Sequence, residues 1–361
     1  MSPTSAAPVR RAGVVRCATP VSTTPSAPGP DGVGFSPRAL LAKSPIDGFV
    51  LAILAAVVVA AFLPARGTFA EVMDWVVIAA IALLFFLYGA RLHPREALAG
   101  LTHWRLHLII LTFTFVVFPI LGVAMRPVVE PLVGESLYLG LLFTCLVPST
   151  VQSSIAFTSI ARGNVPGAIV SASLSNLLGV FLTPVLVVAL MSTQSGMHID
   201  GSAILKIMAQ ILLPFLLGQL ARPWITGWLK KHSEPTKLVD RGSIVLVVYV
   251  AFSEGVRNDI WSRVSVGEVV SVAVIATVIV VAMLLATGKL PPRLGFDRAD
   301  TIAIQFCGTK KSLATGLPMA TVLFAGGTVG LIVLPLMIFH QIQLILCSML
   351  ASRYAKQADA Q

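Results

Sequence analysis

Charged residues are scarce in this sequence, and the common enzyme motifs are absent. Asp, Glu, Lys and Arg make up 12% of its 361 residues, whereas a soluble domain carries about 25%. An ordinary soluble fold is therefore excluded. The sequence contains neither an HExxH nor a GxSxG pattern, and only Glu254 among the acids lies close to an apolar run. With no nucleophile, base or metal set, we expect that the protein is not an enzyme.

Cysteine is also rare and scattered. Cys17, Cys145, Cys307 and Cys347 lie far apart and show no CxxC or metal-binding spacing. We expect neither a disulfide framework nor a metal cofactor.

Apolar residues dominate instead. The hydrophobic fraction is 56% and the mean hydropathy is +0.88, which predicts an all-α polytopic protein whose main partner is the lipid bilayer. A membrane span needs about 20 residues, so the length allows about ten spans. The net charge of +10 is explained by basic cytoplasmic loops rather than by a nucleic-acid partner.

The first 45 residues form a separate region, rich in Pro, Ser, Thr, Ala and Gly, with one acid, Asp31. This composition predicts a disordered tail, and a transit peptide is the alternative. The transporter-like domain then covers residues 46–352, followed by a short tail at residues 353–361. The expected spans are Ile46–Leu63, Val72–Ala90, Leu106–Met125, Leu137–Ala161, Pro166–Met191, Ala203–Ala221, Gly242–Ser253, Val266–Ala286, Ala299–Leu323 and Thr328–Ala351.

Loop charges support this count. On the opposite side from the tail, the expected loops carry only Arg66, Arg126, Lys206, Arg257 and Arg263. Nearly all other Lys and Arg residues fall on the side of the N-terminal tail, which is typical of the cytoplasmic face. We therefore expect both termini in the cytoplasm, in a bacterial inner membrane, or in the stroma or matrix if the membrane is organellar, for example a plastid envelope.

Two expected spans carry a dense polar break. In the fourth, the break is Pro148-Ser-Thr-Val-Gln-Ser-Ser. In the ninth it lies around Lys310 and Lys311, between Gly308 and Ser312. Each broken span is next to last in a set of five, at about residues 46–192 and 203–352. Because five is an odd number, the second set of spans starts from the opposite side of the membrane to the first. The pattern therefore predicts two inverted repeats whose broken helices cross at mid-membrane.

The two lysines of the ninth span have no acidic residue nearby. A charge at that depth costs roughly 2.5–3.5 kcal/mol on insertion scales, so it usually faces a cavity or a partner. The alternatives are a surface loop between two spans and lysines that reach to the interface.

The segments Pro148–Pro184 and Gln305–Ala320 resemble the bile acid:sodium symporter family, and most closely its bacterial and plant SBF-like branch. The resemblance implies a ten-helix fold of inverted repeats with a panel and a core domain, in which the fourth and ninth helices are discontinuous. It also implies alternating-access transport of a small organic anion, usually coupled to sodium.

The resemblance also implies site residues. Hydroxyls after the proline of the fourth span would bind sodium or substrate, and polar groups of the fifth span would face them, whereas Ser173 is assigned to packing. The implied residues are Gln152, Ser153, Ser154, Ser171, Ser175 and Asn176. Their alternative role is close helix packing. A sodium ion, the one candidate cofactor, would lie at Ser153, Ser154, Asn176 and Thr309.

The ninth span departs from the family pattern Glu-x-Gly-x-Gln-Asn. Phe306 replaces the Glu, Lys310 the Gln and Lys311 the Asn. The oxygen ligands left nearby are Gln305, Thr309 and Ser312. Sodium coupling is therefore doubtful. We expect Lys310 to act as a tethered cation held by backbone carbonyls, to exchange a proton during the cycle, or to bind the anion with Lys311 beside it.

The sequence also allows a function other than transport, namely regulation. A membrane regulator of cation uptake would need no intact polar crossing, and it would neither bind nor move a solute. The six histidines, His93, His103, His107, His198, His232 and His340, are interpreted as ordinary interfacial residues. The identity of the substrate, the direction of transport and the oligomeric state have no signature in the sequence.

Overall fold

A computed structural model describes residues 48–91, 103–195, 201–259, 261–324 and 329–359, and all the regular structure in these ranges is helical. The predicted N-terminal tail lies outside the described residues. The elements in chain order are α2 (Gly48–Phe62), α3 (Gly67–Arg91), α5 (Trp104–Thr112), the π-helix η2 (Phe113–Val117), α6 (Phe118–Ala124), α7 (Arg126–Leu146), α8 (Gln152–Ile160), α9 (Val165–Ser195), α10 (Gly201–Lys231), α11 (Ser233–Arg257), the 3-10 helix η3 (Trp261–Arg263), α12 (Val266–Arg293), α13 (Arg298–Thr309), α14 (Leu313–Leu323) and α15 (Val329–Asp359).

Large apolar side chains are exposed on the outside of these helices, such as Trp75 on α3, Leu108 on α5 and Val278 on α12. A helix that is apolar all round suits a hydrocarbon environment. Six of the described helices are long and apolar enough to span a bilayer, and the chain is an integral membrane protein. They are Gly67–Arg91, Trp104–Ala124, Arg126–Leu146, Val165–Met191, Val266–Arg293 and Val329–Ala358.

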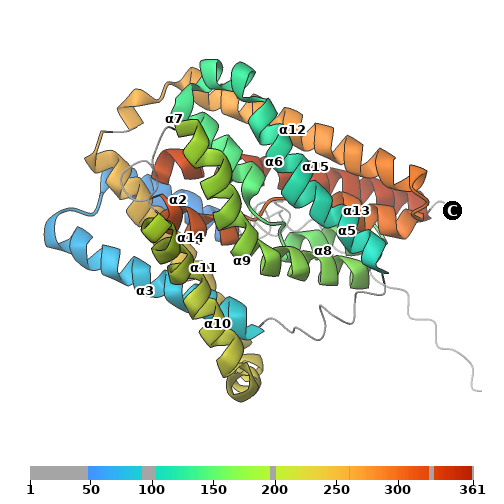
Figure 1. The fold of residues 1–361 in the computed structure, drawn as a ribbon, viewed down its shortest axis with the longest axis horizontal. Coiled ribbons are helices and arrows are strands. Elements are labelled where there is room, and N and C mark those ends of the chain that lie inside the picture. The colour runs from blue at the N-terminus through green and yellow to red at the C-terminus, as the bar shows by residue number, and fades with distance from the viewer. Residues whose placement is uncertain (1–47, 92–102, 196–200, 260, 325–328, 360–361) are drawn as a thin grey trace, which may run out of the picture. The chain divides into compact units, whose positions relative to one another are not determined.

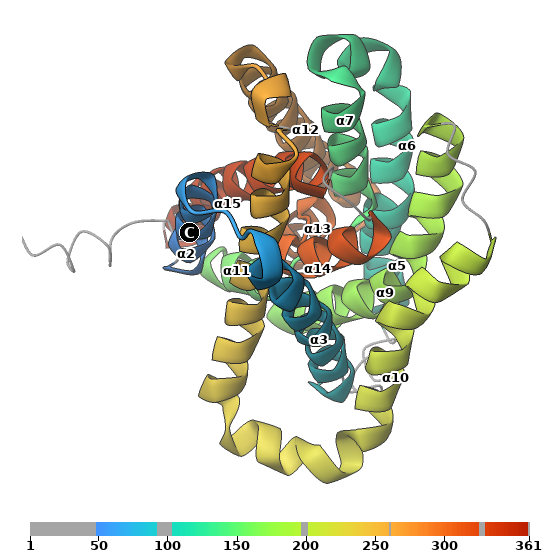
Figure 2. The same ribbon diagram turned by 90° about the vertical axis from the view of Figure 1, so that its left-hand side faces the viewer.

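Each expected span coincides with a helix or with a broken pair of helices, but the count of ten spans and the inverted repeat stay predictions. Two segments outside the expected spans are helical. The basic segment after Ala221 is no loop, because α10 continues to Lys231 and α11 begins at Ser233. This continuous helical path is visible at the bottom of Figure 2. The last helix also continues to Asp359, into the expected tail.

The helix contacts fall into two groups. Helices α2, α3, α10 and α11 pack mainly on one another, and the most extensive of these contacts is between α3 and α10. Glycines allow that approach: a Cβ at Gly89 would lie 2.1 Å from the carbonyl oxygen of Phe215, and one at Gly218 would lie 2.0 Å from that of Phe86. The remaining helices form the second group, in which α15 packs on α7 and α12, and α8 on α9 and α13 (Figure 1).

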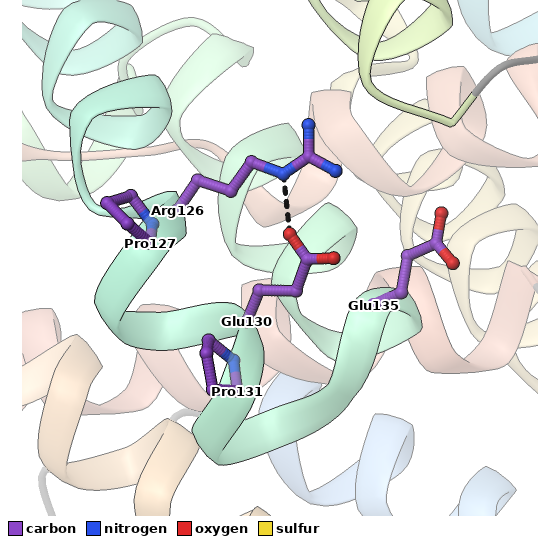
Figure 3. A pocket seen from close by; sticks show the side chains of 5 residues that line it. All are labelled: Arg126, Pro127, Glu130, Pro131 and Glu135. Atoms are coloured by element: carbon purple, nitrogen blue, oxygen red, sulfur yellow. Dashed lines mark hydrogen bonds and ion pairs between the residues drawn. The ribbon is translucent and has the colours of Figure 1, made fainter.

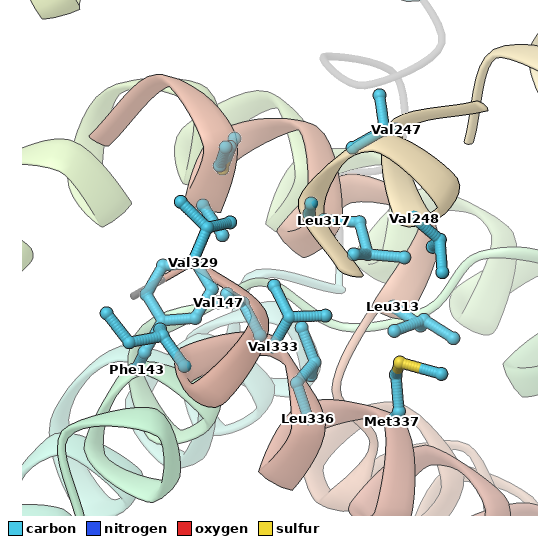
Figure 4. Packing of buried hydrophobic residues seen from close by; sticks show 14 of the residues in the cluster. Phe143, Val147, Val247, Val248, Leu313, Leu317, Val329, Val333, Leu336 and Met337 are labelled. Carbon is cyan, nitrogen blue, oxygen red and sulfur yellow. The ribbon is translucent and has the colours of Figure 1, made fainter. Parts of the chain in front are cut away.

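An apolar cluster joins the two groups around α14. Leu313 and Leu317 of α14 lie between Val247 and Val248 of α11 and Leu336 of α15, as Figure 4 shows. Because these side chains are buried, they fix the short helix α14 although it is only 11 residues long. This packing positions the chain break that precedes α14.

Both predicted polar breaks are present. Helix α7 ends at Leu146, where Val147 adopts extended φ/ψ angles of −76° and 155°. Its successor is Pro148, and a residue before proline is driven out of the helical region. Helix α13 ends at Thr309, and Lys310 is extended with a ψ of 150°. Ser312 then begins α14 as its N-cap, because its side chain accepts a hydrogen bond from the backbone N–H of Thr315.

Candidate functional site

The broken end of α7 exposes five successive carbonyl groups, and each has a specific partner. Lys311 Nζ donates to Cys145 O and Val147 O, and the Thr183 hydroxyl donates to Leu146 O. The carbonyl of Pro148 accepts from the backbone N–H of Ser312, and that of Ser149 accepts from the Asn176 amide. Carbonyls at a helix end need such partners when they are buried. The break is therefore an ordered structure in which each of these carbonyls has a hydrogen-bond donor.

The two breaks touch through their backbones. Ser312 N donates to Pro148 O over 2.8 Å, so the residue that caps α14 is bonded to a residue of the break that follows α7. We expected this meeting of the two polar segments from the sequence, and the hydrogen bond confirms their proximity. Non-helical backbone is tolerated inside a membrane only where protein or a wet cavity surrounds it.

Hydroxyl groups of the first break extend this junction. Ser149 Oγ donates to Cys307 O over 2.6 Å, and Ser154 Oγ donates to Phe306 O over 3.1 Å. These two carbonyls belong to the last turn of α13. The hydroxyl of Thr150 lies 2.8 Å from that of Ser153 and 3.0 Å from that of Ser154. The start of α8 is thereby bonded to the end of α13.

Asn176 of α9 bridges both breaks. Its Nδ2 donates to Ser149 O over 2.7 Å, and its Oδ1 accepts from the Thr315 hydroxyl over 2.8 Å. Ser175 lies next to it and accepts a hydrogen bond from the backbone N–H of Ser149. The structure thus brings Asn176 and Ser175 to the junction, as the resemblance implied.

The two lysines have different surroundings, although both are 0% exposed. Lys311 Nζ donates to three carbonyls, those of Thr114, Cys145 and Val147, each over 2.9 Å. The expected carbonyl cradle therefore exists, but it holds Lys311 and not Lys310. Among the described residues, Lys310 Nζ has no hydrogen-bond partner. It lies 3.8 Å from the centre of the Phe157 ring and 5.7 Å from that of Phe306.

Several predicted site residues have partners elsewhere. Ser171 Oγ lies 2.7 Å from His107 Nδ1 of α5, and Gln152 is exposed. Gln305 donates to Leu284 O of α12 and accepts from the Tyr354 hydroxyl, and the hydroxyl of Thr309 lies 2.9 Å from that of Thr287. The hydrogen bonds described for Ser171, Gln305 and Thr309 therefore lead away from the opposite break. The proposed sodium position, which includes Thr309, stays a prediction.

The sequence analysis missed the contribution of α15. Gln343 is fully buried, and its side-chain amide bonds to both backbone groups of Lys311. Its Oε1 accepts from Lys311 N over 2.8 Å, and its Nε2 donates to Lys311 O over 2.7 Å. The Gln343 amide also lies 2.8 Å from His340 Nδ1. His107 is thus buried, so its interpretation as an interfacial residue was wrong, and His340 is half-buried beside the break. Two polar residues in an otherwise apolar span were a signal that could have found this pair.

A cavity of about 530 Å³ lies at the other end of α7 from the break. Arg126, Pro127, Glu130, Pro131 and Glu135 line it, and Arg126 pairs with Glu130 (Figure 3). The chain bends there, because Gly134 has a φ of 76° inside α7. None of its lining residues belongs to either break, so we place the candidate site at the junction.

An apolar helical protein in which two interrupted helices meet at a polar junction has the architecture of a membrane transport protein. The comparison of sequences agrees. The chain belongs to the SBF-like CPA transporter family, whose profile matches residues 47–356. It is 52% identical over 313 residues to an uncharacterized protein of Pseudomonas aeruginosa, with 87% of this chain and 94% of that protein covered.

Two further relatives place the chain within the family. The Escherichia coli protein YfeH is 48% identical over 320 residues, with 87% of this chain and 94% of that protein covered. The mouse protein named sodium/bile acid cotransporter 7 is 31% identical over 274 residues, with 75% and 80% covered.

Proposed function

We propose that the protein is a secondary active transporter of a small organic anion, working by alternating access, and that Lys310 meets the anion at the junction of the two breaks. The observation that supports the proposal most directly is the Lys310 ammonium, which is buried and lacks a hydrogen-bond partner among the described residues. An unpaired buried charge is costly. Such a group is retained where a ligand or a proton exchange compensates for it during function.

The surroundings favour an anion with an apolar body. The rings of Phe157 and Phe306 lie 6.0 Å apart and flank the ammonium. Aromatic rings bind apolar surface well, while the ammonium would bind a carboxylate or sulfate. Lys311 has no free N–H to share with the anion, since its three donors are in use. We therefore assign the anion to Lys310 alone.

Coupling is proposed to involve protons more than sodium. The mouse relative is named as a sodium cotransporter, but the resemblance places Lys310 where the family has a Gln that binds sodium, and Lys311 where it has an Asn. A fixed ammonium repels a second cation. Lys310 would lose its proton when the anion leaves and regain it when the next anion arrives, because desolvation disfavours the unpaired charged form.

A thermal-shift screen of anionic metabolites, with and without sodium, should first find a compound that stabilises the purified protein, since a ligand that binds the native state raises its stability. Uptake of that compound into proteoliposomes should then depend on pH and little on sodium. We expect Lys310→Gln to abolish this uptake or to make it require sodium. The matched control is Thr321→Val, in which the lost hydroxyl bonds only within α14.

Two results would overturn the proposal. One is steep sodium dependence in the wild type combined with unchanged uptake in Lys310→Gln. The other is a protein that binds and moves no solute in liposomes, which would favour a regulator of cation uptake instead.

A further inference from the structure

Three buried carbonyls converge on one point because the local sequence removes their normal partners. In a π-helical turn, a carbonyl accepts from the N–H five residues ahead. For Thr114 of η2 that residue is Pro119, which has no N–H. For Cys145 the next helical donor would be Ser149 N, but this group donates to Ser175 Oγ instead. Val147 follows the last residue of α7 and is extended.

The Lys311 ammonium satisfies all three. Each Nζ–O distance is 2.9 Å, and an ammonium has three N–H donors, so none is left over. The ring of Phe118 lies 4.2 Å from Nζ and adds a cation–π contact. The backbone of Lys311 is held as well, because Gln343 bonds to both its N–H and its carbonyl.

The contrast with Lys310 is informative because the two lysines are neighbours in one break and are buried equally. Lys310 contacts rings and has no acceptor among the described residues, whereas Lys311 has a complete set of acceptors. Cys145 and Val147 lie at the C-terminal end of α7, where the carbonyls carry partial negative charge. The cradle formed by the carbonyls of Thr114, Cys145 and Val147 therefore has the chemistry of a site for a monovalent cation.

We propose that this three-carbonyl cradle is a built-in cation site whose permanent occupant is the Lys311 ammonium. Lys311 is then a positioning residue. It ties η2 and the end of α7 to the break between α13 and α14, and it keeps a positive charge in the cradle independently of any dissolved ion. This role of Lys311 concerns the stability of the junction and does not depend on the proposed transport function.

Chemical rescue tests the proposal on the full-length protein in detergent. Lys311→Ala should lower the melting temperature by about 5 °C or more, because it leaves three buried carbonyls without donors. Incubation with n-propylammonium should recover most of that loss, since this ion can restore the ammonium to the cradle. Tetramethylammonium at the same ionic strength should not, because it has the charge but no N–H donor.

Lys310→Ala is the matched control. It removes a neighbouring, equally buried ammonium that has no carbonyl cradle, so n-propylammonium should act on it no differently from tetramethylammonium. Equal rescue of the two variants, or equal effects of the two ions on Lys311→Ala, would overturn the proposal.

A second substitution keeps the test decisive if Lys311→Ala folds poorly. Lys311→Met keeps most of the side-chain volume but supplies no donor. If Lys311→Met melts at the wild-type temperature, the cradle needs no cation and the proposal is wrong. If it melts lower than Lys310→Met, or fails to accumulate where Lys310→Met accumulates, the requirement for a cation at residue 311 is supported.

Discussion

At the scale of single residues, Asn176 of α9 bonds to both breaks. Its side chain bonds to Ser149 O, to Ala172 O within its own helix, and to the Thr315 hydroxyl. Asn176→Ala would leave the buried Ser149 carbonyl without its donor. An unsatisfied buried group costs about 1–3 kcal/mol, and the two breaks would lose a direct link.

We therefore expect Asn176→Ala to lower both the melting temperature and the rate of uptake. Asn176→Asp, which keeps an acceptor for Thr315 but loses the donor to Ser149, should show a similar loss. The control is Thr277→Val, because its hydroxyl bonds only to Ala273 O of the same helix. Wild-type stability and uptake in Asn176→Ala would return this residue to a packing role.

The residues of the junction could be predicted only in part. The polar stretches around Pro148 and Lys310 stand out because they interrupt apolar spans. Which lysine reaches the carbonyls depends on the extended backbone at Lys310 and on the Gln343 clamp, and neither has a local signature. Gln305 was expected in the site because it lies close to the second break in the sequence. Its partners, Leu284 O and Tyr354, are distant in the sequence, so these bonds have no local signature either.

At the scale of elements, the close approach of α3 and α10 depends on glycine. A Cβ at Gly218 would lie 2.0 Å from Phe86 O, a backbone atom that no rotamer change can move. Gly218→Ala should therefore push the two helices apart and destabilise the protein by about 1–3 kcal/mol. The measurement is the midpoint of thermal unfolding, followed by the fluorescence of a fused reporter or by light scattering.

Gly227→Ala on the same helix is the matched control, since a Cβ there meets nothing within 4 Å. Alanine is the better helix former by about 0.5–1 kcal/mol, so this variant should be neutral or more stable. A Gly218→Ala protein as stable as Gly227→Ala would show that the helices can separate at no cost.

Element positions followed from the sequence better than element ends. Apolar runs located the helices, and the prolines located the end of α7. The basic stretch after Ala221 was expected to be a loop because of its charges, yet it is helical through Lys231. There, Ile225 and the buried Leu229 pack against Leu87 and Ala90 of α3, and Arg91 pairs with Asp240. Tertiary contacts of this kind override the local charge pattern.

At the scale of the whole molecule, the distribution of Lys and Arg predicts the orientation in the membrane. The adjoining ends of α10 and α11 carry exposed Lys230, Lys231 and Lys237, and basic segments stay in the cytoplasm. The cavity at the start of α7, with Glu130 and Glu135, belongs to a connection on the sparsely basic side. The two regions should therefore lie on opposite faces of the membrane.

Cysteine labelling in intact bacterial cells tests this orientation. The described native cysteines, Cys145, Cys307 and Cys347, are buried, and Cys17 is replaced by serine to remove background. Glu135→Cys, at an exposed position, should react with a membrane-impermeant maleimide in intact cells. Lys231→Cys should react only after the membrane is permeabilised. The reverse pattern would invert the topology, and equal labelling of both from outside would place an even number of spans between them.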